Sequence, residues 1–414
     1  MFEIRKILCI CFVLLFIPFG SAKPPSIWEK GQEKDYTGHT FDEEYWTAIV
    51  KKQTEDGANY SLAVSYVNYS NVQAFLVAFN TYEKNNKTST LPYQMFGMHY
   101  YSPSGEDMFL GAVLAFLLAY NDTYQGQNGL PDAGNEPYYY VLPFGIGETF
   151  NDPSYAPIVT PIEAQKLSDG KYRFGMKYKN LYAKAIDATN PISALLSTAF
   201  PIYIAKFSEL TITYDITFSK DVVTAETFYT IGQISKIWLW GNPTNRTILS
   251  DTFGICAVHF VTILKSKYSV EGAQTGTKIT SGMEKELTEN LTIKVGKKND
   301  RAFEIGYRGK YDLIDEENNI TVEKDKKAYN FLLSPKPADL LLIAWQGRFS
   351  LEVYSIFAYA LSKELQSKYS SPLDLYTRGN ESFTIGAAFW YGVSFPSWKG
   401  YRVVHDPVYK AYIG

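Results

Sequence analysis

The stretch that decides the fold class is Glu209-Leu210-Thr211-Ile212-Thr213-Tyr214-Asp215-Ile216-Thr217-Phe218. Its even positions are apolar and its odd positions are polar or charged, without exception. Successive side chains of a β-strand point to opposite faces, so the pattern predicts a strand with one buried and one wetted face. Ser219-Lys220-Asp221 then reads as a turn into the next apolar stretch.

A second alternating stretch lies upstream and predicts a hairpin. Its apolar positions are Tyr172, Phe174, Met176 and Tyr178, and its basic positions are Lys171, Arg173, Lys177 and Lys179. Ser168-Asp169-Gly170 is a turn signal, so Thr160–Leu167 is the expected partner strand. Similar segments recur along most of the chain. We therefore expect a mainly β fold, a large antiparallel β-sandwich of many strands whose sheets each have one wetted face.

Two segments have helical spacing instead. In Phe41–Thr54 the apolar residues favour a short N-terminal helix. Ala338–Tyr369 has few β-breaking residues, and its second half is amphipathic at helical spacing. It predicts a C-terminal helical segment near 338–369, divided at Gly347.

The first residues predict export. Arg5 and Lys6 precede the apolar run Ile7–Phe19, and Gly20-Ser21-Ala22 offers the small residues of a cleavage site. The run is too short to span a bilayer comfortably. We expect residues 1–22 to be a signal peptide and 23–414 a single large β-rich domain, of which 23–40 is a poorly ordered leader.

Glycosylation sequons support export. Asn-x-Ser/Thr occurs more often than the roughly three instances expected by chance. The candidate acceptors are Asn59, Asn68, Asn86, Asn121, Asn245, Asn290, Asn319 and Asn380. The predicted location is extracellular or at the cell surface. Cys256 is the one cysteine outside the predicted signal, so the mature chain is expected to be stable without disulfides.

Composition excludes some functions and favours others. The formal net charge of −3 argues against nucleic acid as a partner, and no transmembrane span is expected in the mature chain. Aromatic residues make up 16% of the chain. A large β core accounts for most of that content, and aromatic platforms for sugar rings are the alternative explanation.

One loop, 121–136, has the composition of a calcium site. Asn128-Gly129-Leu130-Pro131-Asp132 resembles the second half of the Asp/Asn-rich calcium loops of extracellular repeat proteins. Calcium needs several oxygen ligands on a flexible backbone, and the candidates are Asp122, Asn128, Asp132 and Glu136. Tyr124 and Gly126 stand where that pattern has acidic ligands. An ordinary turn-rich connection is the alternative, and no other cofactor is expected.

Other candidate chemistry is sparse. No two histidines have zinc-ligand spacing, and no Gly-x-Ser-x-Gly occurs. The surface basic face of Lys171, Arg173, Lys177 and Lys179, with Lys166 and Lys184 nearby, is suited either to an anionic polymer or simply to keeping a sheet soluble. We therefore expect a non-enzymatic β-sandwich protein that binds a glycan or another cell-surface component. A glycan-active enzyme (hydrolase, lyase or epimerase) and a lipid-handling protein are the alternatives.

The calcium hypothesis predicts a change in thermal stability. Extracellular modules bind calcium with a Kd on the order of 0.1–1 mM. A cation that binds only the folded state at about 10 mM then contributes roughly 1.4–2.7 kcal/mol. The melting temperature should rise by a few degrees, and Asp132→Ala should abolish the rise. An unchanged wild-type melting curve in calcium would mean that 121–136 is only a turn.

Overall fold

The structure is a computed structural model, and it describes the strands together with parts of their connections. The described residues are 38–53, 59–84, 87–101, 107–121, 138–142, 149–150, 158–185, 202–231, 234–236, 253–264, 285–286, 292–297, 300–306, 311–315, 320–324, 329–330, 355, 358–371, 374–375, 378, 383–384, 394–396 and 402–412.

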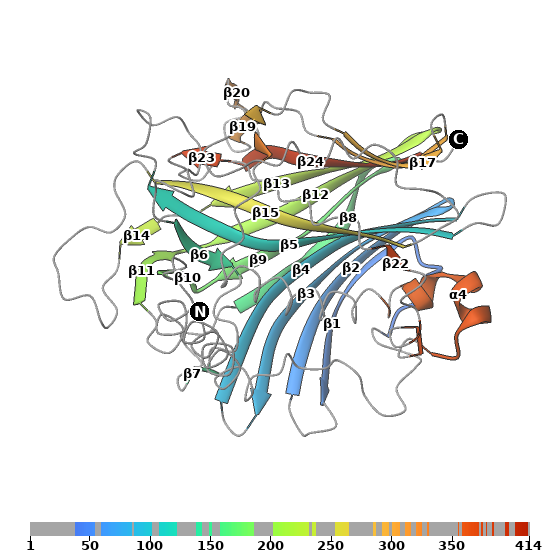
Figure 1. The fold of residues 1–414 in the computed structure, drawn as a ribbon, viewed down its shortest axis with the longest axis horizontal. Helices are drawn as coiled ribbons and strands as arrows, with labels where there is room; N and C mark the ends of the chain where they lie inside the picture. Colours follow the sequence, from blue (N-terminus) through green and yellow to red (C-terminus); the bar gives the residue numbers. More distant parts are fainter. Residues whose placement is uncertain are drawn as a thin grey trace, which may run out of the picture.

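Antiparallel strands form two large sheets (Figure 1). The large sheet runs β1 (Tyr45–Gln53), β2 (Asn59–Tyr69), β3 (Val72–Lys84), β4 (Lys87–Tyr101), β5 (Asp107–Asn121), β6 (Tyr138–Leu142), β10 (Leu181–Ala185), β11 (Ile202–Phe207) and β14 (Ile234–Lys236). It also includes β7 (Thr149–Phe150) beside β4, β15 (Phe253–Leu264) beside β5, and β22 (Phe383–Thr384) and β23 (Ser394–Pro396) beside β15.

The small sheet forms a second layer. It runs β17 (Thr292–Lys297), β18 (Asp300–Gly306), β24 (Arg402–Tyr412), β13 (Val222–Ile231), β12 (Leu210–Phe218), β9 (Lys171–Lys179) and β8 (Ile158–Ser168). β19 (Tyr311–Asp315) pairs with β24 and with β20 (Ile320–Lys324). A separate pair joins β16 (Lys285–Glu286) to β21 (Tyr329–Asn330). The expected mainly β sandwich is confirmed.

The two strands predicted most firmly have the expected register and burial. β8 and β9 form the expected hairpin, and Gly170 in its turn has φ +67°, a conformation that favours glycine. All five apolar residues of β12 are buried. Thr213 is buried too, at 8% exposure, although it lies on the opposite face. It pairs across the ladders with Gly175 and Phe228, so glycine's missing side chain leaves room for it.

The prediction of an N-terminal helix is wrong. Residues 45–53 form β1, paired along their length with β2. Tyr45 and Ile49 lie on the face toward the small sheet, and Trp46 lies on the other face, 4% exposed. Apolar side chains therefore occupy both faces of β1, including the exposed Tyr45 and Ile49, so polarity does not alternate, which is why the spacing favoured a helix.

The C-terminal helical prediction is confirmed where residues are described. α4 (Lys363–Lys368) begins at Ser362, whose hydroxyl accepts a hydrogen bond from the backbone N–H of Leu365 at 3.1 Å. This contact is an N-cap, so α4 begins at a capping serine. Residues 338–354, including Gly347, lie outside the described part. Among the described residues, no helix is long and apolar enough to cross a membrane.

The large sheet departs from the expectation of one wetted face. Ala74 and Leu76 of β3 face the small sheet and are fully buried. Phe75 and Val77 point the other way, and they are fully buried as well. The middle of this sheet is therefore an inner layer with two buried faces, whereas β9 and β12 keep partly exposed polar positions.

Stacked rings and one polar bridge fill the space between the sheets. Phe96 of β4 stacks on Tyr214 of β12 with ring centroids 4.6 Å apart. Beside them, Gln94 donates from Nε2 to the Tyr214 hydroxyl at 2.9 Å, and its Oε1 accepts from the Tyr178 hydroxyl at 2.5 Å. All three polar side chains are essentially inaccessible to solvent. The bridge satisfies them without water and fixes β4 against β9 and β12.

Glycine is required at one position on the other face of the large sheet. A Cβ added at Gly97 would lie 2.2 Å from Cζ of Phe75, whose ring covers the glycine across the β3–β4 ladder. Phe75 is fully buried, and side chains in a closely packed interior shift only at a cost.

We predict that Gly97→Ala destabilises the protein by about 1–3 kcal/mol, because the methyl group overlaps the Phe75 ring. Phe75→Leu removes the ring atoms that would clash. The double variant should therefore be more stable than the sum of the two single effects implies, as measured by urea unfolding in a double-mutant cycle. Strict additivity would contradict the proposed contact.

Candidate functional site

The two sheets are joined where their edge strands β1 and β8 meet. The Thr47 hydroxyl oxygen of β1 accepts a hydrogen bond from the backbone N–H of Ala164 in β8, at 2.8 Å. That N–H is released from the β8–β9 ladder by a register shift between Ile162 and Gln165. Thr47 also contacts the Ser65 hydroxyl at 3.0 Å. The register shift in β8 thus frees a backbone N–H, which forms a hydrogen bond between the small sheet and the large sheet.

A polar and aromatic group, which we call the seam cluster, lies next to this junction. It consists of Glu44, Tyr45, Lys166 and Tyr172. Oε1 of Glu44 accepts a hydrogen bond from Nζ of Lys166 at 2.8 Å and a second, short one from the Tyr172 hydroxyl. The Lys166 ammonium also lies 5.7 Å from the centre of the Tyr172 ring, within cation–π range.

The protonation states of the cluster follow from these contacts. Hydrogen bonds from Lys166 and then Tyr172 lower the pKa of Glu44, so it is a carboxylate at neutral pH. The hydrogen bond to Glu44 raises the pKa of Lys166. Burial, followed by the hydrogen bond to Glu44, raises the pKa of Tyr172 to about 12. The phenol is therefore neutral and acts as a hydrogen-bond donor.

Aromatic rings surround Tyr172 and extend the cluster to the surface. Tyr45 and Tyr69 approach its ring at centroid distances of 5.9 and 6.4 Å. Tyr69 also stacks on Phe218 at 4.8 Å. Tyr172 is fully buried, while Tyr45 is 38% exposed. The side chains of Glu44 and Lys166 are 48% and 37% exposed. The cluster thus presents one aromatic side chain and one ion pair to solvent, on a buried aromatic base.

This arrangement suits recognition more than bond cleavage. Lys166 lies 3.7 Å from Oδ1 of Asp169 as well as 2.8 Å from Glu44, so the two carboxylates share one ammonium group. Glycoside hydrolysis instead needs two acids that flank the sugar, one of them able to give up a proton. Carboxylate and ammonium groups beside an aromatic face can bind vicinal hydroxyls and the apolar face of a sugar.

The predicted calcium ligands Asp122, Asn128, Asp132 and Glu136 all lie outside the described residues, so the calcium prediction is unaffected. Within the described part of the chain, no group of three or more His, Cys, Asp or Glu residues could hold a metal ion.

The predicted basic face is matched by one acid on β12, Asp215, and one just before it, Glu209. Arg173 binds Asp215 through two parallel hydrogen bonds of 2.6 and 2.7 Å, and Lys177 lies 3.0 Å from Glu209. Lys171 and Lys179, at the ends of β9, are exposed. Pairing with β12 makes the centre of this face less suited to an anionic polymer than the basic residues of β9 alone suggested.

Two candidate glycan acceptors have described side chains. Asn59 is exposed at the start of β2, and Asn68 is partly buried near its end. Asn121 ends β5, and its side chain is not described. Asn86, Asn245, Asn290, Asn319 and Asn380 lie outside the described residues.

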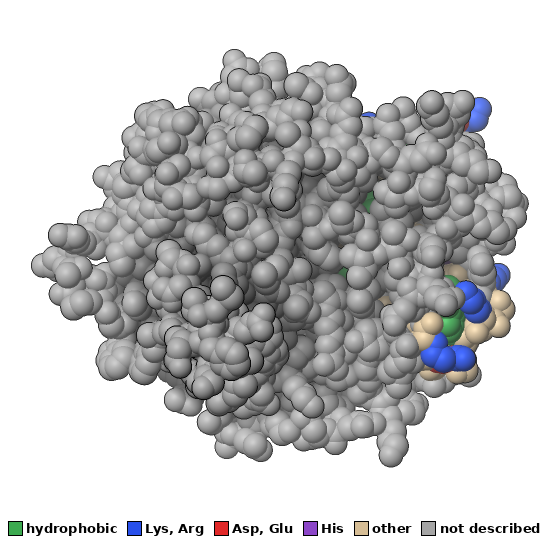
Figure 2. Space-filling model, in the orientation of Figure 1, with side chains coloured by type: hydrophobic (Ala, Val, Ile, Leu, Met, Phe, Trp, Pro, Cys, Tyr) green, Lys and Arg blue, Asp and Glu red, His purple; other side chains and the backbone are tan. Residues whose placement is uncertain are grey.

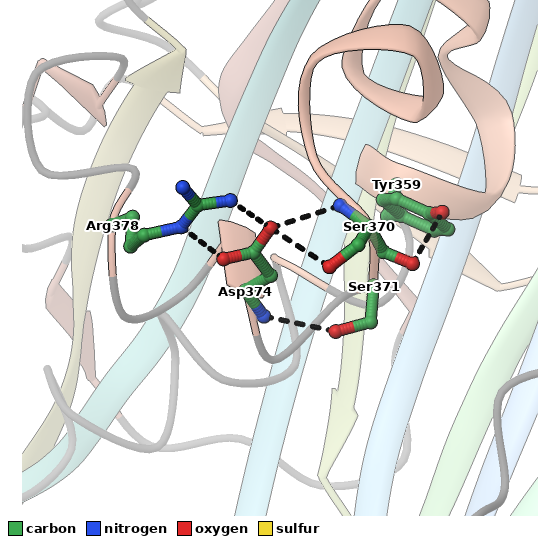
Figure 3. Close-up of polar contacts among 5 residues, drawn as sticks. All are labelled: Tyr359, Ser370, Ser371, Asp374 and Arg378. Atoms are coloured by element: carbon green, nitrogen blue, oxygen red, sulfur yellow. Dashed lines mark hydrogen bonds and ion pairs between the residues drawn. The ribbon is translucent and has the colours of Figure 1, made fainter.

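A second polar cluster lies in the helical segment (Figure 3). Asp374 accepts from the backbone N–H and the hydroxyl of Ser370, at 2.9 and 3.0 Å, and forms two short bonds with Arg378. The Ser371 hydroxyl accepts from the backbone N–H of Asp374 at 3.1 Å. The Arg378 hydrogen bond and then the Ser370 backbone lower the pKa of Asp374. These contacts cap a helical turn, so Asp374 has a structural role.

Figure 2 shows basic side chains exposed around a small apolar patch, where Figure 1 places the helical segment. The exposed basic residues of this segment are Lys363, Lys368 and Arg378. Lys368 lies over the Tyr369 ring at 5.4 Å, and Arg378 pairs with Asp374. Two of these three cations thus have partners in their own segment.

The sequence did not identify the seam cluster. Glu44 and Tyr45 lie in the stretch interpreted as a helix, and Lys166 was grouped with the basic face of β9. Glu44 is 122 residues from Lys166 and 128 from Tyr172. These residues come together only because β1 and β8, edge strands of different sheets, meet at the seam. The one local signal was the polar glutamate just before the aromatic pair Tyr45-Trp46.

The seam contacts predict a specific pH dependence. Because folding lowers the pKa of Glu44, its stabilising contribution is present above the unfolded pKa, about 4.3, and is lost as the pH falls through the folded value. Glu44→Gln should lower the melting temperature at pH 7, and its difference from wild type should shrink toward pH 3. Glu163→Gln, which removes a carboxylate from β8, is the control. A difference that does not depend on pH would contradict the assignment.

No protein-family model matches this chain, and neither the curated proteins nor the solved structures include a match.

Proposed function

We propose that the chain is an exported, non-enzymatic β-sandwich protein that binds carbohydrate or another surface component at the seam cluster. The observation that carries the proposal is the exposed ring of Tyr45, 38% accessible, beside the part-exposed Glu44–Lys166 ion pair. An aromatic face and paired hydrogen-bonding groups are the two elements that sugar recognition combines.

The base of the site favours binding because it is rigid. Tyr172 is held by the Glu44 carboxylate and packed against Tyr69 and Phe218. The ion pair is already formed, so a ligand does not have to order it, which lowers the entropic cost of binding. Export rests on the N-terminal signal pattern and the sequons.

The described interior is less suited to the two alternatives. Stacked rings and the Tyr178–Gln94–Tyr214 bridge fill the centre of the sandwich, where lipid handling would require an apolar cavity. At the seam, the hydrogen bonds from Lys166 and Tyr172 lower the pKa of Glu44, so this carboxylate is a poor proton donor. Both features support a binding role.

The test is binding of neutral oligosaccharides to the folded protein. The probes are hexamers of β-1,4-glucose, α-1,4-glucose and β-1,4-N-acetylglucosamine, followed by ligand-observed NMR. Tyr45→Ala should weaken binding of the preferred hexamer about tenfold, equivalent to about 1.4 kcal/mol.

Ile49→Ala is the matched control, because Ile49 lies on the same strand and face, is 55% exposed and has no aromatic ring. Its affinity should stay within about twofold of wild type. Equal losses in both variants would indicate nonspecific apolar contact. Failure of every hexamer to bind would remove carbohydrate as the ligand.

A further inference from the structure

We propose that Asn59 is an N-glycan acceptor in the folded protein and that the neighbouring sequon at Asn68 is not, because the Asn68 amide is a structural element of the large sheet. This inference is independent of ligand binding at the seam, and it needs only passage through an export pathway that glycosylates.

The Asn68 side chain is bonded at both ends. Its Nδ2 donates to the backbone carbonyl of Phe41 at 3.2 Å, and its Oδ1 accepts from Nε2 of Gln73 at 3.0 Å. Its backbone N–H donates to the carbonyl of Glu44 at 2.7 Å. The segment that leads into β1 is thereby fastened to β2 and β3.

The chain of hydrogen bonds continues inward with a fixed polarity. A carbonyl can only accept, so Phe41 sets the orientation of the Asn68 amide, and Asn68 sets that of Gln73. Gln73 therefore presents Oε1 to Nδ1 of His99 at 2.5 Å, and His99 must donate from that nitrogen. His99 is 3% exposed and stacks on Phe109 at 4.2 Å. A disturbance at Asn68 therefore reaches a buried histidine.

Glycan attachment is incompatible with these bonds. In the transfer, the amide nitrogen attacks the anomeric carbon of a lipid-diphosphate-linked oligosaccharide. The carbon–oxygen bond to the diphosphate breaks, the electron pair leaves with the lipid diphosphate, and one Nδ2 proton passes to a base. The product is a secondary amide, which prefers the trans form by about 2.5 kcal/mol. The sugar carbon then lies on the same side as Oδ1, where Gln73 donates to Asn68.

Asn59 has the opposite environment. It is exposed at the first position of β2, opposite the terminal residue Gln53 of β1 and opposite Glu83 near the end of β3. Its side chain is exposed at the end of the strand, so a glycan there can extend into solvent. Asn59 and Asn68 belong to the same strand, but only one of their amides is committed to the fold.

The test uses the full chain behind a heterologous secretion signal in yeast, whose secretory pathway supplies the lipid-linked oligosaccharide and the transferase. Chymotrypsin separates the two sequons after Tyr66, and mass spectrometry of secreted, folded protein should find a glycan on Asn59 and none on Asn68. Asn59→Gln should remove one glycan from the intact mass. Ser70→Ala abolishes the second sequon while leaving the Asn68 amide in place, and it should remove none.

Thermal stability supplies a second readout. Asn68→Gln displaces the amide from Phe41 and Gln73 and should lower the melting temperature by several degrees, whereas Asn59→Gln should leave it unchanged. A glycan on Asn68 in secreted protein that melts normally would overturn the proposal. Absence of a glycan on Asn59 in the secreted protein would overturn the proposal that Asn59 is an acceptor. Both outcomes leave binding at the seam unaffected, so the two proposals fail separately.

Discussion

A sheet buried on both faces must find protein partners for every polar group that it contains, and this requirement organises the molecule. The described residues 74–78 of β3 and 94–100 of β4 are buried on both faces of the large sheet. An unsatisfied polar group there costs about 1–3 kcal/mol, a sizeable fraction of the stability of a typical domain. Two hydrogen-bonded chains meet the requirement. One joins Gln94 to tyrosines of the small sheet, and the other runs from Phe41 through Asn68 and Gln73 to His99.

Tyrosine supplies much of the buried aromatic surface. Six tyrosines, Tyr66, Tyr172, Tyr178, Tyr214, Tyr229 and Tyr409, are among the largest fully buried side chains of the described residues. A tyrosine ring fills space as phenylalanine does, and its hydroxyl can bond a neighbouring strand, carboxylate or carbonyl. Tyr66 bonds the carbonyl of Phe41, and Tyr172 bonds Glu44. Most of the aromatic content described thus belongs to the core, and Tyr45 at the seam is a surface exception.

At the seam, by contrast, polar side chains are partly exposed and can also hydrogen-bond to water. β1 and β8 are edge strands, and they meet at the seam. β8 contains Pro161, two register shifts and charged residues, features that discourage another strand from adding to an edge. The first shift aims the Ala164 N–H at Thr47, and the Glu44–Lys166 pair lies beside it. Edge protection and the candidate binding surface therefore lie side by side, with Lys166 belonging to both.

The sequence by itself determined β9, β12 and the hairpin between β8 and β9. Those strands have one partly exposed face, so apolar and polar residues alternate along them with a period of two. The sequence also predicted a helical conformation for the segment that contains α4. Only the tertiary structure decided the conformation of β1, because apolar side chains on both of its faces leave no alternation to read. Tertiary structure alone also decided the seam cluster and the different environments of Asn59 and Asn68. Long-range strand pairing sets which side chains meet, and no local pattern encodes a contact across more than a hundred residues.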